Sequence, residues 1–198
     1  MAKPRSRGGK PGARSRLRII AGRWRGRLVA FDDVPGLRPT PDRVRETAFN
    51  WLTPYLPGAR CLDLFAGSGA LGLEALSRGA AQAVMVDANR RVTDTLAEQA
   101  GILGAEHARI VHADVLAFLD GPAQPFDLVF LDPPYGQDLL APCCERLETR
   151  GWLAPGARIY LEAERELGVP AVPADWEVVR SKHAGQVGYH LAVRRATA

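Results

Sequence analysis

Short apolar runs alternate with helix-like segments over most of the chain. The runs lie at residues 60–65, 83–86, 109–111, 126–131 and 158–161. Apolar residues recur at helical spacing between them, over residues 70–79, 90–103, 114–119 and 138–149. Alternating strands and helices form right-handed βαβ units, so we predict an α/β fold with a mostly parallel sheet that is covered on both faces.

The two ends of the chain depart from this alternation. Residues 176–181 and 187–193 are strand-like and have no helix between them, which predicts a C-terminal antiparallel hairpin on the sheet. Near the N-terminus, apolar positions flank Gly22-Arg23-Trp24-Arg25-Gly26 and predict another β-hairpin. We therefore divide the chain into a disordered basic arm (1–16), an N-terminal β-hairpin extension (17–36) and a main domain (37–198).

A helix is expected to begin near Thr40-Pro41-Asp42. Threonine is a good N-cap, proline suits the first helical position, and aspartate favours the positive end of the helix dipole. Apolar residues then recur at helical spacing as far as Leu52, so one face of this helix is predicted to be buried.

Positive charge is concentrated at the N-terminal end of the chain. Residues 1–31 hold ten Lys or Arg and no Asp or Glu, whereas residues 32–198 hold 16 basic and 22 acidic residues. A basic arm on an acidic domain indicates a polyanionic partner. A solubilising tail would show the same composition.

The cysteines and histidines argue against several classes of site. Cys61, Cys143 and Cys144 form neither a CxxC pair nor an even disulfide set, and the four histidines lack metal-ligand spacing. The sequence has no apolar run long enough for a membrane span and no secretory signal. We expect a cytoplasmic protein without a bound metal, and a monomer, since no feature of the sequence requires an oligomer.

A glycine turn follows the first strand of the main domain, in Asp63-Leu64-Phe65-Ala66-Gly67-Ser68-Gly69. Dinucleotide oxidoreductases and class I methyltransferases share such a turn, because glycines let the backbone approach a ligand closely. Acidic residues at the ends of three successive strands distinguish the two classes, namely Asp63, Asp87 and Asp114. They suit a cationic amino-acid nucleoside better than a pyrophosphate at the carboxyl edge of the sheet.

Each of these acids has a matching cofactor group. Asp63 can meet an ammonium group, Asp87 the ribose hydroxyls, and Asp114 the adenine amino group. Asp87 and Asp114 can instead cap the helices that follow them. We also assign to the cofactor site Phe65, Gly67, Gly69 and Thr40.

Asp132-Pro133-Pro134-Tyr135 leaves the end of the fourth strand. Two prolines fix consecutive φ angles, and a stiff loop suits preorganised chemistry. The Asp132 carboxylate and the Pro133 carbonyl can accept both N–H groups of a planar exocyclic amine, so that its lone pair turns toward a methyl donor. Tyr135 offers a face on which an unpaired base can stack. In the alternative interpretation, the tetrapeptide is a tight turn and Tyr135 only packs.

With these motifs, the chain resembles the RsmD-type methyltransferases, which methylate the N2 amino group of a guanine in 16S ribosomal RNA. The resemblance begins near Leu17 and rests on residues 18–26, 38–47, 63–69, 132–135 and 185–187. It implies a class I, Rossmann-like fold with a seven-stranded sheet and S-adenosylmethionine as the cofactor. It also implies 16S ribosomal RNA as the partner, within a small-subunit particle. Thr40-Pro41 stands where the family pattern is Thr-Thr.

Basic residues of the extension and of the first helix are the candidate RNA contacts. Arginines seek phosphates, and a tryptophan can provide a stacking surface. The candidates are Arg18, Arg23, Trp24, Arg25, Arg27, Arg38 and Arg43. Arg45 can serve the same purpose or pair with Asp42 or Glu46.

Three other functions fit the same motifs. The tetrapeptide specifies a planar amino group and not a particular base, so adenine N6 in DNA or RNA stays open. A glutamine amide in a protein is a second target, against which the basic arm argues. The third alternative is a non-catalytic RNA-binding module on a methyltransferase fold. It is disfavoured by four intact residues, Asp63, Asp87, Asp132 and Tyr135.

Overall fold

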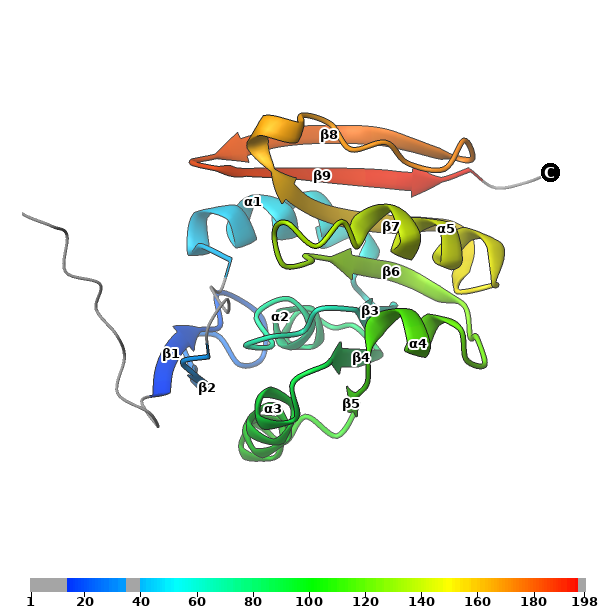
Figure 1. Cartoon of the computed structure of the whole chain (residues 1–198). Helices are drawn as coiled ribbons and strands as arrows, with labels where there is room; N and C mark the ends of the chain where they lie inside the picture. The colour runs from blue at the N-terminus through cyan, green and yellow to red at the C-terminus, as the bar shows by residue number, and fades with distance from the viewer. Residues whose placement is uncertain (1–13, 35–39, 196–198) are drawn as a thin grey trace, which may run out of the picture.

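A seven-stranded mixed sheet runs through the molecule (Figure 1), seen in a computed structural model that describes residues 14–34 and 40–195. Its strands are β3 (Arg60–Asp63), β4 (Gln82–Asp87), β5 (Ala108–His112), β6 (Phe126–Leu131), β7 (Leu153–Glu164), β8 (Trp176–Ala184) and β9 (Val187–Arg194). They lie in the order β5-β4-β3-β6-β7-β9-β8, in which the first five are parallel and β9 and β8 are antiparallel. The predicted α/β class, the mostly parallel sheet and the C-terminal hairpin are confirmed.

Helices cover both faces of this sheet. They are α1 (Asp42–Leu52), α2 (Gly72–Ser77), α3 (Arg90–Leu103), α4 (Val115–Leu119) and α5 (Leu140–Thr149), with short 3₁₀ turns η1 (Thr53–Tyr55) and η2 (Arg165–Leu167). The first three pack on one face and the last two on the other. Within the two described ranges, no helix is long and apolar enough to cross a membrane.

Side chains alternate between the two faces, as the period of a strand requires. In the central strands, Cys61 and Phe130 belong to the core beneath α1, α2 and α3, whereas Leu62 and Leu131 belong to the core beneath α4 and α5. Asp63 and Asp132 each lie two residues beyond these positions, so they are on the same face of the sheet as α1 and α2. The core pattern therefore decides which face of the sheet carries the polar groups of the site.

The N-terminal extension is an antiparallel hairpin of β1 (Arg14–Arg18) and β2 (Leu28–Asp32). β1 begins at Arg14, so the end of the segment expected to be disordered forms a strand; residues 1–13 lie outside the described part of the chain. Beside the hairpin, the buried Glu74 on α2 accepts hydrogen bonds from the backbone N–H groups of Ile20 at 2.8 Å and Ala21 at 3.0 Å. These bonds fix the extension to the main domain, which it joins as one packed unit (Figure 1).

Candidate active site at the carboxyl edge of the sheet

The glycine turn after β3 has the backbone geometry that only glycine adopts without strain. Gly67 and Gly69 have φ angles of 50° and 77°, in the left-handed region. At the end of the neighbouring strand β4, Asp87 holds this turn, because its Oδ2 accepts from the Gly67 N–H at 3.0 Å. Its Oδ1 accepts from the Asn89 N–H at 2.8 Å, and it is Asn89 that caps α3. Asp87 therefore stabilises the glycine turn, and the N-cap of α3 is Asn89.

Asp63 is a buried acid, and only one of its two carboxylate oxygens is hydrogen-bonded within the described residues. Its side chain is 1% exposed, and its Oδ2 accepts from the Gly72 N–H at 3.1 Å. Among the described residues, Oδ1 has no hydrogen-bond partner. Burial raises the pKa of Asp63 to about 7, and the nearby negative charges of Asp132 and Asp87 act in the same direction. An unpaired buried acceptor of this kind fits a cationic group of a ligand.

The candidate catalytic loop, Asp132-Pro133-Pro134-Tyr135, begins directly after β6. The Asp132 carboxyl is partly buried, and burial raises its pKa to about 6. Thr40 donates its hydroxyl hydrogen to Asp132 Oδ2 at 3.3 Å. Because β3 and β6 are neighbours, with Asp63 paired to Phe130, the loop starts next to the buried Asp63.

This contact corrects the capping role predicted for Thr40. Pro41 occupies the N-cap position of α1, and no side chain caps that helix. The Thr40 hydroxyl is directed instead to Asp132, which stands 92 positions further along the chain. The structure therefore places Thr40 in the hydrogen-bond network of the Asp132 loop, and its assignment to the cofactor site stays a prediction.

The rest of the loop is held from the next strand. Pro133 is buried, and the Gly136 N–H donates to Glu164 Oε1 at the end of β7 at 3.0 Å. Tyr135 is 47% exposed, so one face of its ring is accessible. Partial burial raises the pKa of the Tyr135 phenol to about 12, with smaller contributions from Glu162, Asp132 and Glu164. Tyr135 is thus a neutral aromatic surface at physiological pH.

Two polar residues of this site were not predicted. Glu162 on β7 is 3% exposed, and the Tyr160 hydroxyl donates to its Oε1 at 2.8 Å. Burial, followed by the charge of Asp132, raises the pKa of Glu162 well above its ordinary value. The available signal was an acid in an apolar run, as at Asp63. The predicted strand ended at residue 161, one position too early to include it.

Asp114 is an exposed side chain and acts as the cap of α4. Its Oδ1 accepts from the Ala117 N–H at 2.9 Å, which is the capping interpretation left open by the sequence. Phe65 lies half-buried in the glycine turn and packs against the core beneath α4 and α5. Both are near the edge that holds Asp63 and Asp87, at the ends of adjacent strands.

The candidate RNA contacts divide into exposed arginines and a buried tryptophan. The exposed side chains are Arg18, Arg23, Arg25, Arg27 and Arg43. In the described part of the chain, none of the five forms an ion pair with a carboxylate. Arg38 lies outside the described residues. Arg45 is buried and donates to Asp42 Oδ1 at 2.6 Å. Of the two roles left open for Arg45, the structure therefore shows the local ion pair.

Trp24 does not offer the predicted stacking surface. It is 6% exposed in the core beneath α1, α2 and α3, and its backbone N–H donates to Ser77 Oγ at 3.0 Å. The Arg23 guanidinium lies 4.2 Å from the centre of its ring. The prediction for Trp24 was wrong because the docking of the hairpin on α2 buries the indole.

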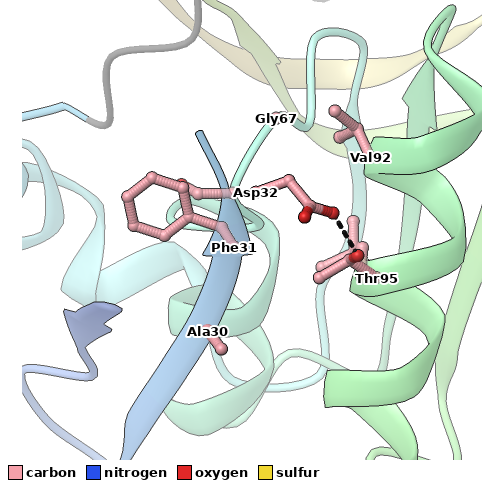
Figure 2. Close-up of a pocket in the computed structure, with 8 residues that line it drawn as sticks. Ala30, Phe31, Asp32, Gly67, Val92 and Thr95 are labelled. Carbon is pink, nitrogen blue, oxygen red and sulfur yellow. Dashed lines mark hydrogen bonds between the residues drawn. The ribbon is translucent and has the colours of Figure 1, made fainter. Parts of the chain in front are cut away.

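A narrow pocket lies where the extension meets the glycine turn (Figure 2). β2 contributes Ala30, Phe31 and Asp32, the turn contributes Gly67, and α3 contributes Thr95 among others. Asp32 points toward α3, where its carboxylate accepts hydrogen bonds from the Thr95 hydroxyl and, at 2.8 Å, from Arg91. The extension is therefore bonded to α3 and lies beside the glycine turn, with which it lines the pocket.

One known protein family matches this chain over most of its length. The model of the family described as Conserved hypothetical protein 95 matches residues 17–193. The chain belongs to this family. Members include ribosomal RNA small subunit methyltransferase D of Escherichia coli strain K12, which is 52% identical over 91% of this chain and 91% of its own length. Its counterpart in Haemophilus influenzae is 43% identical over 91% and 95%.

Solved structures agree with this membership. A methyltransferase structure from Escherichia coli is 48% identical, with a TM-score of 0.87, and the match covers 92% of this chain and 100% of that one. The Thermus thermophilus 16S rRNA N2 G1207 methyltransferase, solved with AdoMet and guanosine, has a TM-score of 0.66 at 20% identity over 92% of this chain and 50% of its own. At 20% identity, the similarity to the Thermus thermophilus enzyme supports the fold alone. The predicted resemblance, the class I fold and the methyltransferase class of this family member are confirmed.

Proposed function

We propose that this chain transfers the methyl group of S-adenosylmethionine to the N2 amino group of a guanine in small-subunit ribosomal RNA. One observation carries the proposal. Asp132, an acceptor for an amino group, lies next to Asp63, a buried acceptor with a free oxygen, at the ends of neighbouring strands. The site thus presents a place for a cationic methyl donor beside a place for an amine.

The residues of the first three strand ends would hold the cofactor. Asp63 would accept from the ammonium group through Oδ1, which no described residue occupies. Asp87 would accept from the ribose hydroxyls, since each carboxylate oxygen has a second lone pair beyond its backbone contact. Asp114 has less support as the adenine ligand, because it is exposed and already caps α4. When bound, S-adenosylmethionine supplies an electrophilic methyl group.

The catalytic loop would prepare the amine. Asp132 would accept one N–H of the amino group and the Pro133 carbonyl the other, which draws the nitrogen lone pair out of conjugation with the ring. Much of the catalysis is then in-line positioning by a preorganised loop. The nitrogen gains a methyl group and loses one proton, which passes to Asp132 or to water. Asp132 must be ionised for this role, so activity is expected to fall as the pH drops below about 6.

The RNA would bind on the exposed arginines near the N-terminus. Arg18, Arg25 and Arg27 project uncompensated charge from a hairpin that is fixed to the domain. The curated relatives carry the name of ribosomal RNA small subunit methyltransferases, which supports the substrate class. The choice of guanine N2 rests on the family. Action on an assembled small-subunit particle, by a monomer, is part of the same proposal.

The proposal is tested by offering four substrates with labelled S-adenosylmethionine: small-subunit particles, naked ribosomal RNA, DNA and bulk protein. We expect label in small-subunit RNA, offered naked or within the particle, and at least a hundredfold less with Asp132→Asn, which cannot accept as a carboxylate. Label in DNA or protein, or equal label with the variant, would contradict the proposal.

A further inference from the structure

Glu162 is a buried acid beside the catalytic loop, and the chemistry proposed above does not use it. β7 pairs with β6 in register, with Leu161 opposite Leu131, so Glu162 and Asp132 follow side by side. Both are on the α1 side of the sheet, where Glu162 is 3% exposed. A buried carboxylate is costly unless a cation or several donors compensate it.

The surroundings of Glu162 offer hydroxyls and other acids. Tyr160 donates from the same strand at 2.8 Å, and Tyr189 is its partner on β9. The Thr40 hydroxyl lies beside it, and Asp132 and Asp63 are the nearby acids. No Lys or Arg within residues 14–34 and 40–195 forms an ion pair with Glu162. The electrostatics of the cluster therefore favour a neutral carboxyl group.

The hydrogen atoms of the cluster are compatible with a neutral Glu162. The Thr40 hydroxyl has one hydrogen, which it donates to Asp132 Oδ2 at 3.3 Å. It cannot donate that hydrogen to Glu162 as well. If Glu162 carries its own proton, it can donate to the Thr40 oxygen, and every group in the chain from Tyr160 to Asp132 is satisfied.

We propose that Glu162 is a positioning residue of the methyl-transfer site. Its protonated carboxyl group donates to Thr40, whose hydroxyl holds Asp132 Oδ2 and leaves the other oxygen of Asp132 for the amino group of the substrate. The proton released from the methylated amine passes to Asp132 and then to water, because Glu162 is already protonated. The positioning role rests on the proposed function, because that function supplies the substrate. The neutral state of Glu162 does not depend on it.

The test compares two substitutions of Glu162 in single-turnover methyl transfer. Glu162→Ala leaves buried donors and acceptors unpaired and is expected to slow transfer about 10- to 100-fold. Glu162→Gln keeps a neutral donor and acceptor and is expected to recover most of that loss, to within about threefold of the natural enzyme. Equal losses in the two variants would show that the group must be a carboxylate, against the proposal.

The pH profile of methyl transfer distinguishes a neutral Glu162 from a charged one. If Glu162 is neutral, the acid limb set by Asp132 stays near pH 6 in Glu162→Gln. If Glu162 is charged, its removal takes away a repulsive neighbour, so the pKa of Asp132 falls and the limb moves to lower pH. A downward shift of about one unit or more would therefore overturn the proposal.

A spectroscopic measurement keeps the inference independent of the substrate. The measurement uses an Asp63→Asn background, because the pKa of Asp63 of about 7 would leave that acid partly protonated. At neutral pH its infrared spectrum should contain a protonated carboxylic acid band that Glu162→Gln removes and that Glu177→Gln, at an exposed acid on β8, leaves in place. An unchanged band in Glu162→Gln would refute the neutral state. A natural enzyme that methylates no RNA would instead refute the proposed function and leave this result intact.

Discussion

Ionisable side chains are exposed in the N-terminal extension, whereas those at the carboxyl edge of the sheet are largely buried. The extension exposes Arg18, Arg25 and Arg27 to solvent without acidic partners in the described chain. The edge buries Asp63 and Glu162 and partly buries Asp132, and desolvation raises the pKa of each carboxyl group. Exposed charges retain their hydration and attract a polyanion over a distance, whereas buried acids have protonation states that respond to their neighbours.

This difference implies that RNA affinity and chemistry can be separated by mutation. The extension contacts α3 through Asp32, yet its exposed Arg18, Arg25 and Arg27 have no acidic partner among the described residues. Changes in the extension should alter RNA binding and its salt dependence. Changes at the edge should alter cofactor affinity or the methyl-transfer rate. The following predictions test that separation, beginning with the largest effect.

Asp132→Ala is expected to reduce methyl transfer about 10³-fold, because the amine loses the carboxylate that accepts its N–H and its proton. RNA affinity should stay within about threefold, since the phosphate contacts lie elsewhere. Single-turnover kinetics and RNA titration measure the two quantities. Asp175→Ala, at an exposed acid before β8, is the control. A variant that keeps near-normal turnover would refute the role of Asp132.

Asp63→Asn is expected to weaken S-adenosylmethionine binding about 30-fold at pH 8, by roughly 2 kcal/mol for a charge-assisted hydrogen bond. The natural enzyme should lose affinity as the pH falls below about 7, where Asp63 takes up a proton. The variant should show a flatter profile, and calorimetric titration between pH 6 and 8 measures both. Identical profiles for the two proteins would remove Asp63 from the cofactor site.

The same acid predicts a pH-dependent stability of the cofactor-free protein. The pKa of Asp63 is raised from 3.8 to about 7, so the folded state retains a proton that the unfolded state releases between these values. The contribution of Asp63 to the free energy of unfolding therefore decreases as the pH rises from about 4 to about 7. Thermal unfolding of Asp63→Asn should show a smaller decrease over this range. A steeper decrease in the variant would contradict the assignment.

The double substitution of Arg25 and Arg27 by Ala is expected to weaken RNA binding about tenfold and to reduce the salt slope by about 2. Cofactor affinity and the rate with saturating RNA should be nearly unchanged. Filter binding at several salt concentrations measures the affinity. Arg195→Ala removes an exposed arginine at the far end of β9 and serves as the control. An equal effect of the control would mean that the loss reflects net charge and not the extension.

Asp114→Asn should have the smallest effect. Asparagine caps a helix about as well as aspartate, so α4 should persist. Cofactor affinity is expected to change by less than about threefold, since the exposed carboxylate contributes little net energy. A loss of tenfold or more would show that Asp114 is a direct ligand of the adenine amino group.

The sequence predicted the sheet well because its strands are buried and its helices are amphipathic. Apolar runs located the central strands, and acids that follow such runs located Asp63, Asp87 and Asp132. The prediction fell short at β7, whose first half contains Pro155 and Gly156, residues that usually interrupt a strand. The predicted strand therefore began too late, at residue 158. Its early end at residue 161, before Glu162, is a separate error, because the apolar run stops there and Glu162 and Glu164 follow.

Long-range contacts account for the remaining errors. The capping rule is local, and it could not show that the Thr40 hydroxyl meets Asp132 from a distant part of the chain. A tryptophan among arginines looks like an exposed RNA contact, but α2 buries Trp24. Both errors concern side chains whose partners come from elements that are remote in sequence, which neither composition nor periodicity records.

The most direct test of the central claim is the identity of the methylated nucleoside. Small-subunit particles lacking the modification would be incubated with the enzyme and labelled S-adenosylmethionine, and the RNA would be digested to nucleosides for mass analysis. We expect the label as N2-methylguanosine at one position of the small-subunit RNA, and we expect Asp132→Ala to abolish it. Label recovered as N6-methyladenosine, or in ribosomal protein, would contradict this expectation.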